Sequence, residues 1–270
     1  MPKCFIKYND GFNICNAQPS DGKVPAGIYK YEAGFSGYRL EEMKFNHDEI
    51  IDIPSKEFKL AIKNLDNFLE ETTKAKYTKE GFIYKLNICF HGIPGTGKTV
   101  LVSRIAQEVV KKGGIVVFDP EPSELSKLYE ALDTMQPETL CMVVFEEFDD
   151  TIRHNEKTLL SLLDGEVQKS NMIYVATTNH LDKIPARILR PGRFPVVMEI
   201  LSPTEEERLY FLNKKLDNDQ EAALWAENTE GFTIDDLKVL VSSVKLLNNN
   251  YLEVITNIRN FKKTLLENKQ

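Results

Sequence analysis

The chain has 270 residues, of which 42% are hydrophobic and 28% charged, as in a soluble globular protein of one compact module with a modest extension. Its formal net charge of -7 disfavours binding to nucleic acid or to an anionic membrane through overall charge. There is no apolar signal core and no stretch apolar enough to span a bilayer, so we expect a cytoplasmic protein without a membrane anchor.

Residues 1–54 are rich in Gly, Tyr, Phe and turn residues. Short runs at Cys4–Tyr8, Ile28–Tyr31 and Tyr38–Phe45 predict strands, and none of them carries recognisable chemistry. We therefore expect a small β-rich N-terminal domain over residues 1–54. A helix is predicted from Ser55, and the polar segment Thr72–Glu80 is interpreted as a linker.

Residues 55–202 are predicted to form an α/β core. Apolar strands alternate with amphipathic helices, a pattern typical of a parallel sheet covered on both faces. The five strands are expected at Leu86–His91, Ile115–Phe118, Leu140–Phe145, Met172–Thr177 and Val196–Leu201. The helices are expected at Val100–Lys111, Ser123–Met135 and Glu156–Leu163. The chain becomes entirely helical after Pro203, which indicates a small helical lid over residues 203–270.

A glycine-rich segment carries the strongest chemical indication. Gly92-Ile-Pro-Gly-Thr-Gly-Lys98-Thr99 matches the GxxxxGK[ST] pattern between a strand and a helix, which is the setting that a phosphate-binding loop (P-loop) requires. Its glycines allow backbone N–H groups to surround phosphate oxygens at a helix N-terminus. Lys98 would neutralise the β- and γ-phosphates, and the Thr99 hydroxyl would ligate Mg²⁺.

Two acids follow the third predicted core strand. Glu146 and Glu147 end an apolar run, and the carboxyl ends of parallel strands are where ligands bind in open α/β sheets. One acid is expected to hold Mg²⁺, and the other to polarise the attacking water. Asn179 ends the next strand and could bond the γ-phosphate or its water, although a turn-forming Asn is the alternative.

Two arginines flank a Pro-Gly turn at Arg190 and Arg193. Arginine suits the stabilisation of phosphoryl transfer, because its guanidinium is planar and always charged. An isolated arginine would instead form a surface salt bridge.

These segments, in this order and spacing, resemble the AAA+ ATPases, in particular the AAA subfamily proper. The approach to the P-loop also resembles the branch that contains the mitochondrial Rieske-protein translocase. The resemblance implies a P-loop NTPase αβα core, ATP and Mg²⁺ as ligands, Glu147 as the catalytic glutamate and Asn179 as the sensor-1 polar residue. It further implies that Arg190 and Arg193 act on the nucleotide of a neighbouring subunit, and that Thr99 and Glu146 hold the metal.

Nucleotide contacts are expected from Gly92, Ile93, Pro94, Gly95, Thr96, Gly97, Lys98, Thr99 and Val100.

The chain departs from the family pattern in two places. Glu146 stands where the family has Asp, which permits an altered metal geometry or slow turnover. The segment that begins at Asp119 lacks the aromatic–hydrophobic–Gly loop of unfoldases. Leu128 and Tyr129 could take its place, but Leu128 belongs to an apolar helix face that we expect to pack on the core.

We therefore expect an ATPase that forms a homo-oligomeric, hexamer-like ring and remodels an unidentified protein client. Two alternatives stay open: a switch or scaffold that turns ATP over slowly, and a DNA-directed loader or initiator. The acidic charge makes nucleic acid an unlikely partner.

Overall fold

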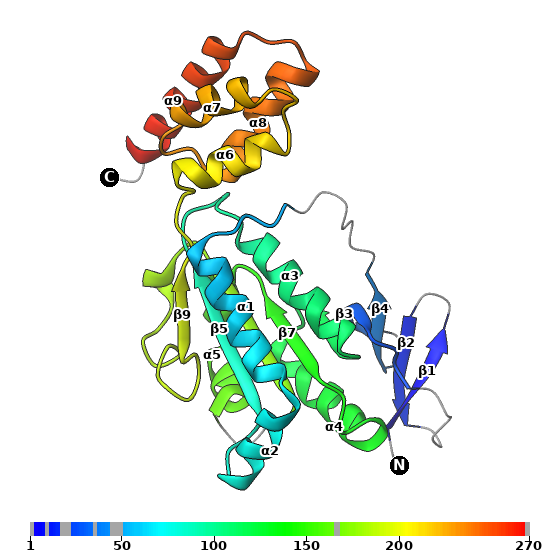
Figure 1. Ribbon diagram of the computed structural model, residues 1–270. Helices are drawn as coiled ribbons and strands as arrows, with labels where there is room; N and C mark the ends of the chain where they lie inside the picture. The colour runs from blue at the N-terminus through cyan, green and yellow to red at the C-terminus, as the bar shows by residue number, and fades with distance from the viewer. Residues whose placement is uncertain are drawn as a thin grey trace.

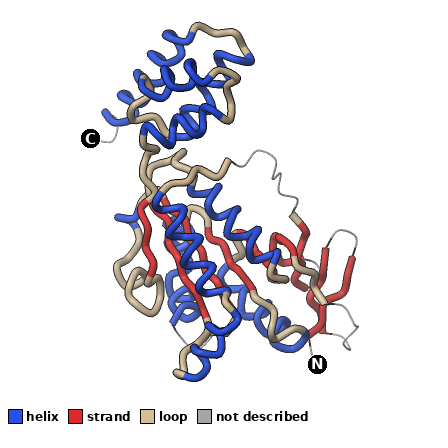
Figure 2. Tube along the Cα trace, viewed as in Figure 1, coloured by secondary structure: helices blue, strands red, loops and turns tan. Residues whose placement is uncertain are grey.

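The computed structural model describes residues 3–8, 11–16, 23–34, 37–43, 51–164 and 168–267. Figure 1 shows a twisted sheet with helices on both faces and a separate cluster of helices, α6–α9, above it. Figure 2 shows that the strands are confined to the lower body and that the upper cluster is wholly helical. The α/β class and the helical lid predicted from the sequence are both confirmed.

One nine-stranded sheet runs through the described residues in the order β1-β2-β4-β3-β6-β7-β8-β5-β9. The five predicted core strands are present and pair in parallel. They are β5 (Lys85–His91), β6 (Ile115–Phe118), β7 (Cys141–Phe145), β8 (Met172–Thr178) and β9 (Val196–Glu199).

The strand count of the prediction needs one correction, because the sheet continues beyond β6. β3 adds a sixth parallel strand next to β6, and three antiparallel strands follow. The additional strands are β1 (Lys3–Tyr8), β2 (Gly11–Asn16), β3 (Gly27–Gly34) and β4 (Gly37–Glu42). The predicted strand end at Phe45 lies outside the described residues.

Both faces of the sheet are buried under helices. In β7, the side chains of Cys141, Val143 and Phe145 join one apolar cluster with α4 and α5, while Met142 and Val144 join another with α1 and α3. Successive residues of a strand point to opposite faces, so a strand buried on both sides must be apolar throughout. The helices are α1 (Lys56–Leu69), α2 (Glu71–Lys79), α3 (Lys98–Lys111), α4 (Leu125–Met135) and α5 (Phe148–Asp164).

One helix prediction was too short and one was wrong. The helix expected at Glu156–Leu163 is present, but α5 already begins at Phe148, because Phe148 is buried and extends the apolar face past a kink at Asn155. The segment taken as a linker forms α2, which buries no residue and therefore shows no periodicity in the sequence. By contrast, the core assignment of Leu128 is confirmed, since it is fully buried in α4.

The N-terminal strands share a core with the rest of the sheet. Val24, Tyr29 and Leu40 are buried in the same cluster as α4 and α5. The Gln136 side chain accepts a hydrogen bond from the Val24 backbone N–H (2.8 Å) and donates one to the Val24 carbonyl (3.3 Å). Residues from both sides of position 55 thus build one apolar cluster.

The lid has its own apolar core around Phe211, Trp225 and Leu237. Buried Arg208 donates hydrogen bonds to the carbonyls of Pro203 and Ala226. The first of these bonds connects α6 to the segment that follows β9, residues 200–203, which we call the strand exit. The lid elements are α6 (Glu205–Asn213), α7 (Asp219–Glu227), α8 (Ile234–Val241), a π-helical turn (Ser242–Leu246) and α9 (Tyr251–Glu267). Among the described helices, none has both the length and the apolar character needed to cross a membrane.

Leu40→Ala should destabilise the whole core if the N-terminal strands belong to it. The variant leaves a cavity in a fully buried position and should lower the free energy of unfolding by about 3 kcal/mol. Glu41→Ala, on the exposed side of the same strand, is the control and should change it little. Urea unfolding followed by circular dichroism measures both. Equal effects of the two variants would contradict a shared core.

Candidate functional site

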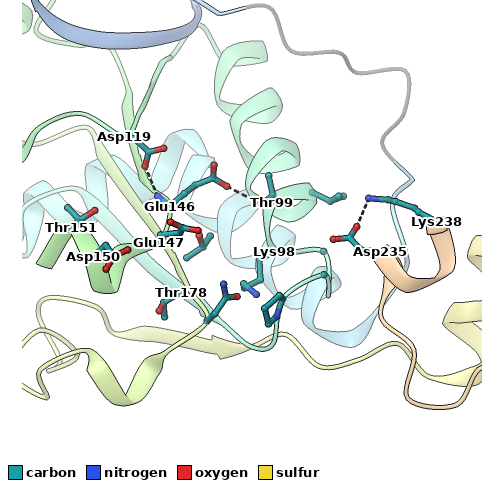
Figure 3. Close-up of a pocket in the computed structure, with 16 residues that line it drawn as sticks. Lys98, Thr99, Asp119, Glu146, Glu147, Asp150, Thr151, Thr178, Asp235 and Lys238 are labelled. Atoms are coloured by element: carbon teal, nitrogen blue, oxygen red, sulfur yellow. Dashed lines mark hydrogen bonds and ion pairs between the residues drawn. The ribbon is translucent and has the colours of Figure 1, made fainter. Parts of the chain in front are cut away.

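A cavity of about 810 Å³ lies where the P-loop, the carboxyl ends of β6, β7 and β8, and lid helix α8 meet. Figure 3 shows its lining residues. They are Pro94, Gly95, Gly97, Lys98, Thr99, Val100, Asp119, Glu146, Glu147, Asp150, Thr151, Thr177, Thr178, Asn179, Asp235 and Lys238.

The P-loop depends on its glycines. Gly95 (φ 81°) and Gly97 (φ 99°) have left-handed backbone conformations, which favour glycine, and Gly97 directly precedes α3. Gly92 approaches the strand exit so closely that a Cβ atom there would lie 2.3 Å from the carbonyl oxygen of Ile200. Of the remaining expected contact residues, Ile93 is half exposed and Thr96 lines a neighbouring cavity.

Lys98 is a nearly buried cation at the start of α3. Its exposed fraction is 8%, and its ammonium donates to the carbonyl oxygens of Gly92 (2.8 Å) and Ile93 (2.9 Å). Burial lowers the pKa of the Lys98 ammonium, and the charge of Asp235 acts in the opposite direction. The cavity therefore presents a fixed positive charge next to a helix N-terminus.

Thr99 and Glu146 meet across the cavity. The Thr99 hydroxyl donates to Glu146 Oε1 at 3.0 Å, so the longer side chain of Glu146 reaches the P-loop from the end of β7. Hydroxyl and carboxylate oxygens are the ligand types that Mg²⁺ accepts, so the pair fits this ion. No group of three or more His, Cys, Asp or Glu side chains that could hold a metal occurs in the described parts of the chain.

The turn after β7 is strained. Glu147 has a left-handed backbone (φ 46°), and so does Asp119 (φ 41°) at the end of neighbouring β6. Asp119 Oδ1 accepts a hydrogen bond from the Glu146 backbone N–H (2.7 Å), and the Asp119 N–H donates to the Val144 carbonyl (2.9 Å). Such strain persists only where surrounding contacts determine the backbone. Asp119 thus anchors the turn that presents Glu146 and Glu147.

The environment of Asp119 opposes its ionisation. Burial raises the pKa of the Asp119 carboxyl, and the nearby Glu146 and Glu147 charges raise it further, whereas the Glu146 N–H bond lowers it. We missed Asp119 in the sequence because we examined its segment only as a loop. An acid at the carboxyl end of a core strand was the available indication.

The end of β8 is also held firmly. Buried Thr178 donates a hydrogen bond to Asp149 Oδ1 (2.6 Å) and accepts one from the His180 N–H (2.9 Å). Asn179 lies between these two anchors, is exposed, and lines the cavity.

Arg190 and Arg193 lie outside the lining of this cavity. Arg193 forms an ion pair with Asp164 (3.5 Å) and donates to the Arg187 carbonyl. Arg190 is exposed, and its side chain has no ion pair or hydrogen bond within the described residues, although its carbonyl accepts one from the Arg193 N–H (3.0 Å). The two arginines belong to the same sequence motif, but their side chains have different surroundings in the structure.

The lid contributes two residues that the sequence analysis did not select. Asp235 and Lys238, on α8, line the cavity and form an ion pair (2.9 Å). They lie more than 130 residues after the P-loop, so only the fold of the lid reveals their position.

An αβα core with a phosphate loop and strand-end acids defines a P-loop nucleoside triphosphatase. Residues 88–201 match the model of the ATPase family associated with various cellular activities (AAA). Residues 88–201 are thus similar to an AAA-type ATPase domain, as the motifs predicted. The resemblance to the Rieske-protein translocase branch stays a prediction.

Curated relatives carry names of ATP-dependent proteins. An "ATP-dependent zinc metalloprotease FtsH" from Endomicrobium trichonymphae is 30% identical over 237 residues, which are 77% of this chain and 37% of the relative. A "Proteasome-activating nucleotidase" from Aeropyrum pernix is 30% identical over 178 residues, or 57% of this chain and 44% of the relative. The chain thus spans less than half the length of either. The 270 residues contain no H-E-x-x-H zinc-protease motif.

Asp119→Ala should slow ATP hydrolysis without a matching loss of ATP affinity, because it frees the backbone that carries Glu146 and Glu147. A displacement of this kind should lower kcat by about tenfold. Asp119→Asn keeps an oxygen acceptor and should retain more activity, while exposed Glu121→Ala is the control. Steady-state kinetics and calorimetry measure the two effects. Equal activity of the Ala and Asn variants would contradict the anchoring role.

Proposed function

We propose that this chain is a Mg²⁺-dependent ATPase that works in a ring and remodels a protein client. The single observation that carries the proposal is the meeting of Lys98, Thr99, Glu146, Glu147 and Asn179 around one cavity. These groups match, in chemical type and relative position, what phosphoryl transfer to water requires.

Each of these residues has a distinct proposed role. The P-loop N–H groups and Lys98 bind the phosphates. When phosphate binds, the Lys98 ammonium leaves the carbonyl oxygens of Gly92 and Ile93 and donates to phosphate oxygens instead. Thr99 and Glu146 hold Mg²⁺, which neutralises developing charge when it is bound. Glu147 accepts a proton from the attacking water, and Asn179 orients that water.

A second cavity of about 270 Å³ adjoins the first and fits a nucleotide base. It shares Gly97 and Val100 with the phosphate cavity. Its remaining walls are largely apolar and come from the start of α1, the strand exit and the lid, through Phe58, Ile200 and Ile234. A planar ring could stack there while the attached phosphates reach Lys98. The preference for adenine rests on the similarity to the AAA family.

The ring is supported by the position of Arg190. An exposed arginine whose side chain has no partner among the described residues, placed away from its own cavity, can act on the nucleotide of a neighbouring subunit. Head-to-tail contacts of this kind form closed rings. Arg193 instead forms contacts within its own chain, so we propose Arg190 as the principal finger and Arg193 as its support.

A protein client is supported by the names of the relatives, which describe a protease and a proteasome activator. Buried Leu128 and Tyr129 are unavailable to grip a client in a pore. The second candidate, a slowly hydrolysing ATP switch, is favoured by one observation: Glu146, in place of Asp, bonds directly to Thr99. No feature of the described surface favours the DNA-directed alternative.

Glu147→Gln should bind ATP normally and hydrolyse it about 10²–10⁴-fold more slowly, because the amide cannot accept a proton. Calorimetry and phosphate release measure binding and turnover. Lys98→Ala is the control that should fail to bind, since the phosphates lose their direct counter-ion. If Glu147→Gln hydrolysed ATP at the wild-type rate, the catalytic assignment of Glu147 would be wrong. A wild-type protein that binds ATP tightly and hydrolyses it very slowly would favour the alternative of an ATP-dependent switch.

Arg190→Ala should leave ATP affinity nearly unchanged and lower turnover by about 10³-fold, the lower end for a finger arginine in other P-loop systems. Arg187→Ala, in the same segment but paired with Glu156, is the matched control. Specific activity of the wild type should also rise with protein concentration as rings form. A monomer that hydrolyses ATP at a concentration-independent rate would rule out the ring.

A further inference from the structure

Asp235 places a negative charge over the P-loop from the lid. Its backbone N–H donates to the Gly95 carbonyl (3.3 Å), and a Cβ atom on Gly95 would lie 3.2 Å from Asp235 Oδ2. Figure 3 shows Asp235 and Lys238 on a separate segment, across the cavity from Asp119, Glu146 and Glu147. Helix α8 therefore contacts the loop through a residue whose carboxylate faces the phosphate cavity.

Local structure does not require this carboxylate. The N-terminus of α8 is capped by Thr233 and Asp236, which bond to each other's backbone N–H groups. Asp235 contributes only an exposed i,i+3 ion pair with Lys238, a kind of interaction that stabilises little. An acid in the first turn is favourable for any helix, but this one also lies against a phosphate-binding loop.

The charged residues that line the cavity show how the Asp235 carboxylate would affect a phosphate ligand. Five acids and two lysines line the cavity. Four of the acids, Asp119, Glu146, Glu147 and Asp150, lie on the side where Mg²⁺ would be held, and the ion would offset part of their charge. Asp235 lies on the lid side, where its ion-pair partner Lys238 is exposed, so its carboxylate would face the phosphates of a bound nucleotide.

We propose that Asp235 is an electrostatic latch, which holds lid helix α8 against the P-loop and repels nucleotide phosphate from the cavity. The inference rests on the proposed function of the cavity. Phosphate binding opposes the latch through charge repulsion, so the position of the lid reports whether the P-loop carries phosphate. The charge of Asp235 acts on the same cavity, since it raises the pKa of Lys98 against the larger effect of burial.

The latch predicts that removing a charge improves binding. Asp235→Asn keeps the size and the backbone contact but removes the repulsion, so the full chain should bind ADP about three- to tenfold more tightly at low salt. The gain should shrink in high salt, because the carboxylate is exposed. Asp219→Asn, an exposed first-turn acid of lid helix α7, is the matched control and should have no effect.

Calorimetry with ADP and with 2′-deoxy-ADP, at low and high salt, tests the proposal. Both nucleotides should gain equally from Asp235→Asn. In hydrogen exchange without nucleotide, residues 233–241 should exchange faster in this variant than in the wild type or in Asp219→Asn.

Unchanged or weaker ADP binding by Asp235→Asn would overturn the latch. A change in the affinity for ADP but not for 2′-deoxy-ADP would also overturn it, because Asp235 would then act on the ribose hydroxyls. Unchanged exchange over residues 233–241 would also overturn it. Failure of the wild type to bind ADP at all would instead refute the proposed function of the cavity.

Discussion

The close approach of Gly92 to the strand exit is the constraint on which the site depends. The Ile200 N–H donates to the His91 carbonyl at 2.7 Å, and no side chain fits between Gly92 and the Ile200 carbonyl. This contact fixes the end of β5, the start of the P-loop and the path of the chain into the lid at a single point. The phosphate cavity, the apolar cavity and the lid contact at Gly95 all lie around it. A glycine is needed there for space as well as for its backbone conformation.

Sheet order then decides which polar residues meet. Parallel strands place their carboxyl ends at one edge, so Asp119, Glu146 and Asn179 reach the cavity from three different strands. The order β6-β7-β8-β5 sets the P-loop of β5 next to β8, with the acids of β7 beyond. The strained backbone at Glu147 is tolerated because Asp119 holds the preceding amide from the neighbouring strand.

The N-terminal strands are part of the sheet that carries the site. They extend the sheet beyond β6 and bury Tyr29 and Leu40 in the same cluster that supports α4 and α5. They are therefore continuous with β6, the strand that ends one residue before Asp119.

The sequence by itself determined the chemistry of the site and the class of the fold. The glycine spacing of residues 92–99 and the apolar runs ending in Glu147 and Asn179 are local patterns, and local patterns are visible in a sequence. The five core strands could be predicted for the same reason, since a strand buried on both faces is apolar throughout.

Only the tertiary structure decided what depends on contacts between distant segments. The junction of β3 with β6 was not predictable, because backbone pairing leaves no trace in side-chain periodicity. The different surroundings of Arg190 and Arg193 are set by Asp164, which lies on another helix. Asp235 enters the phosphate cavity because the lid folds back across the P-loop, and no spacing in the sequence encodes that return.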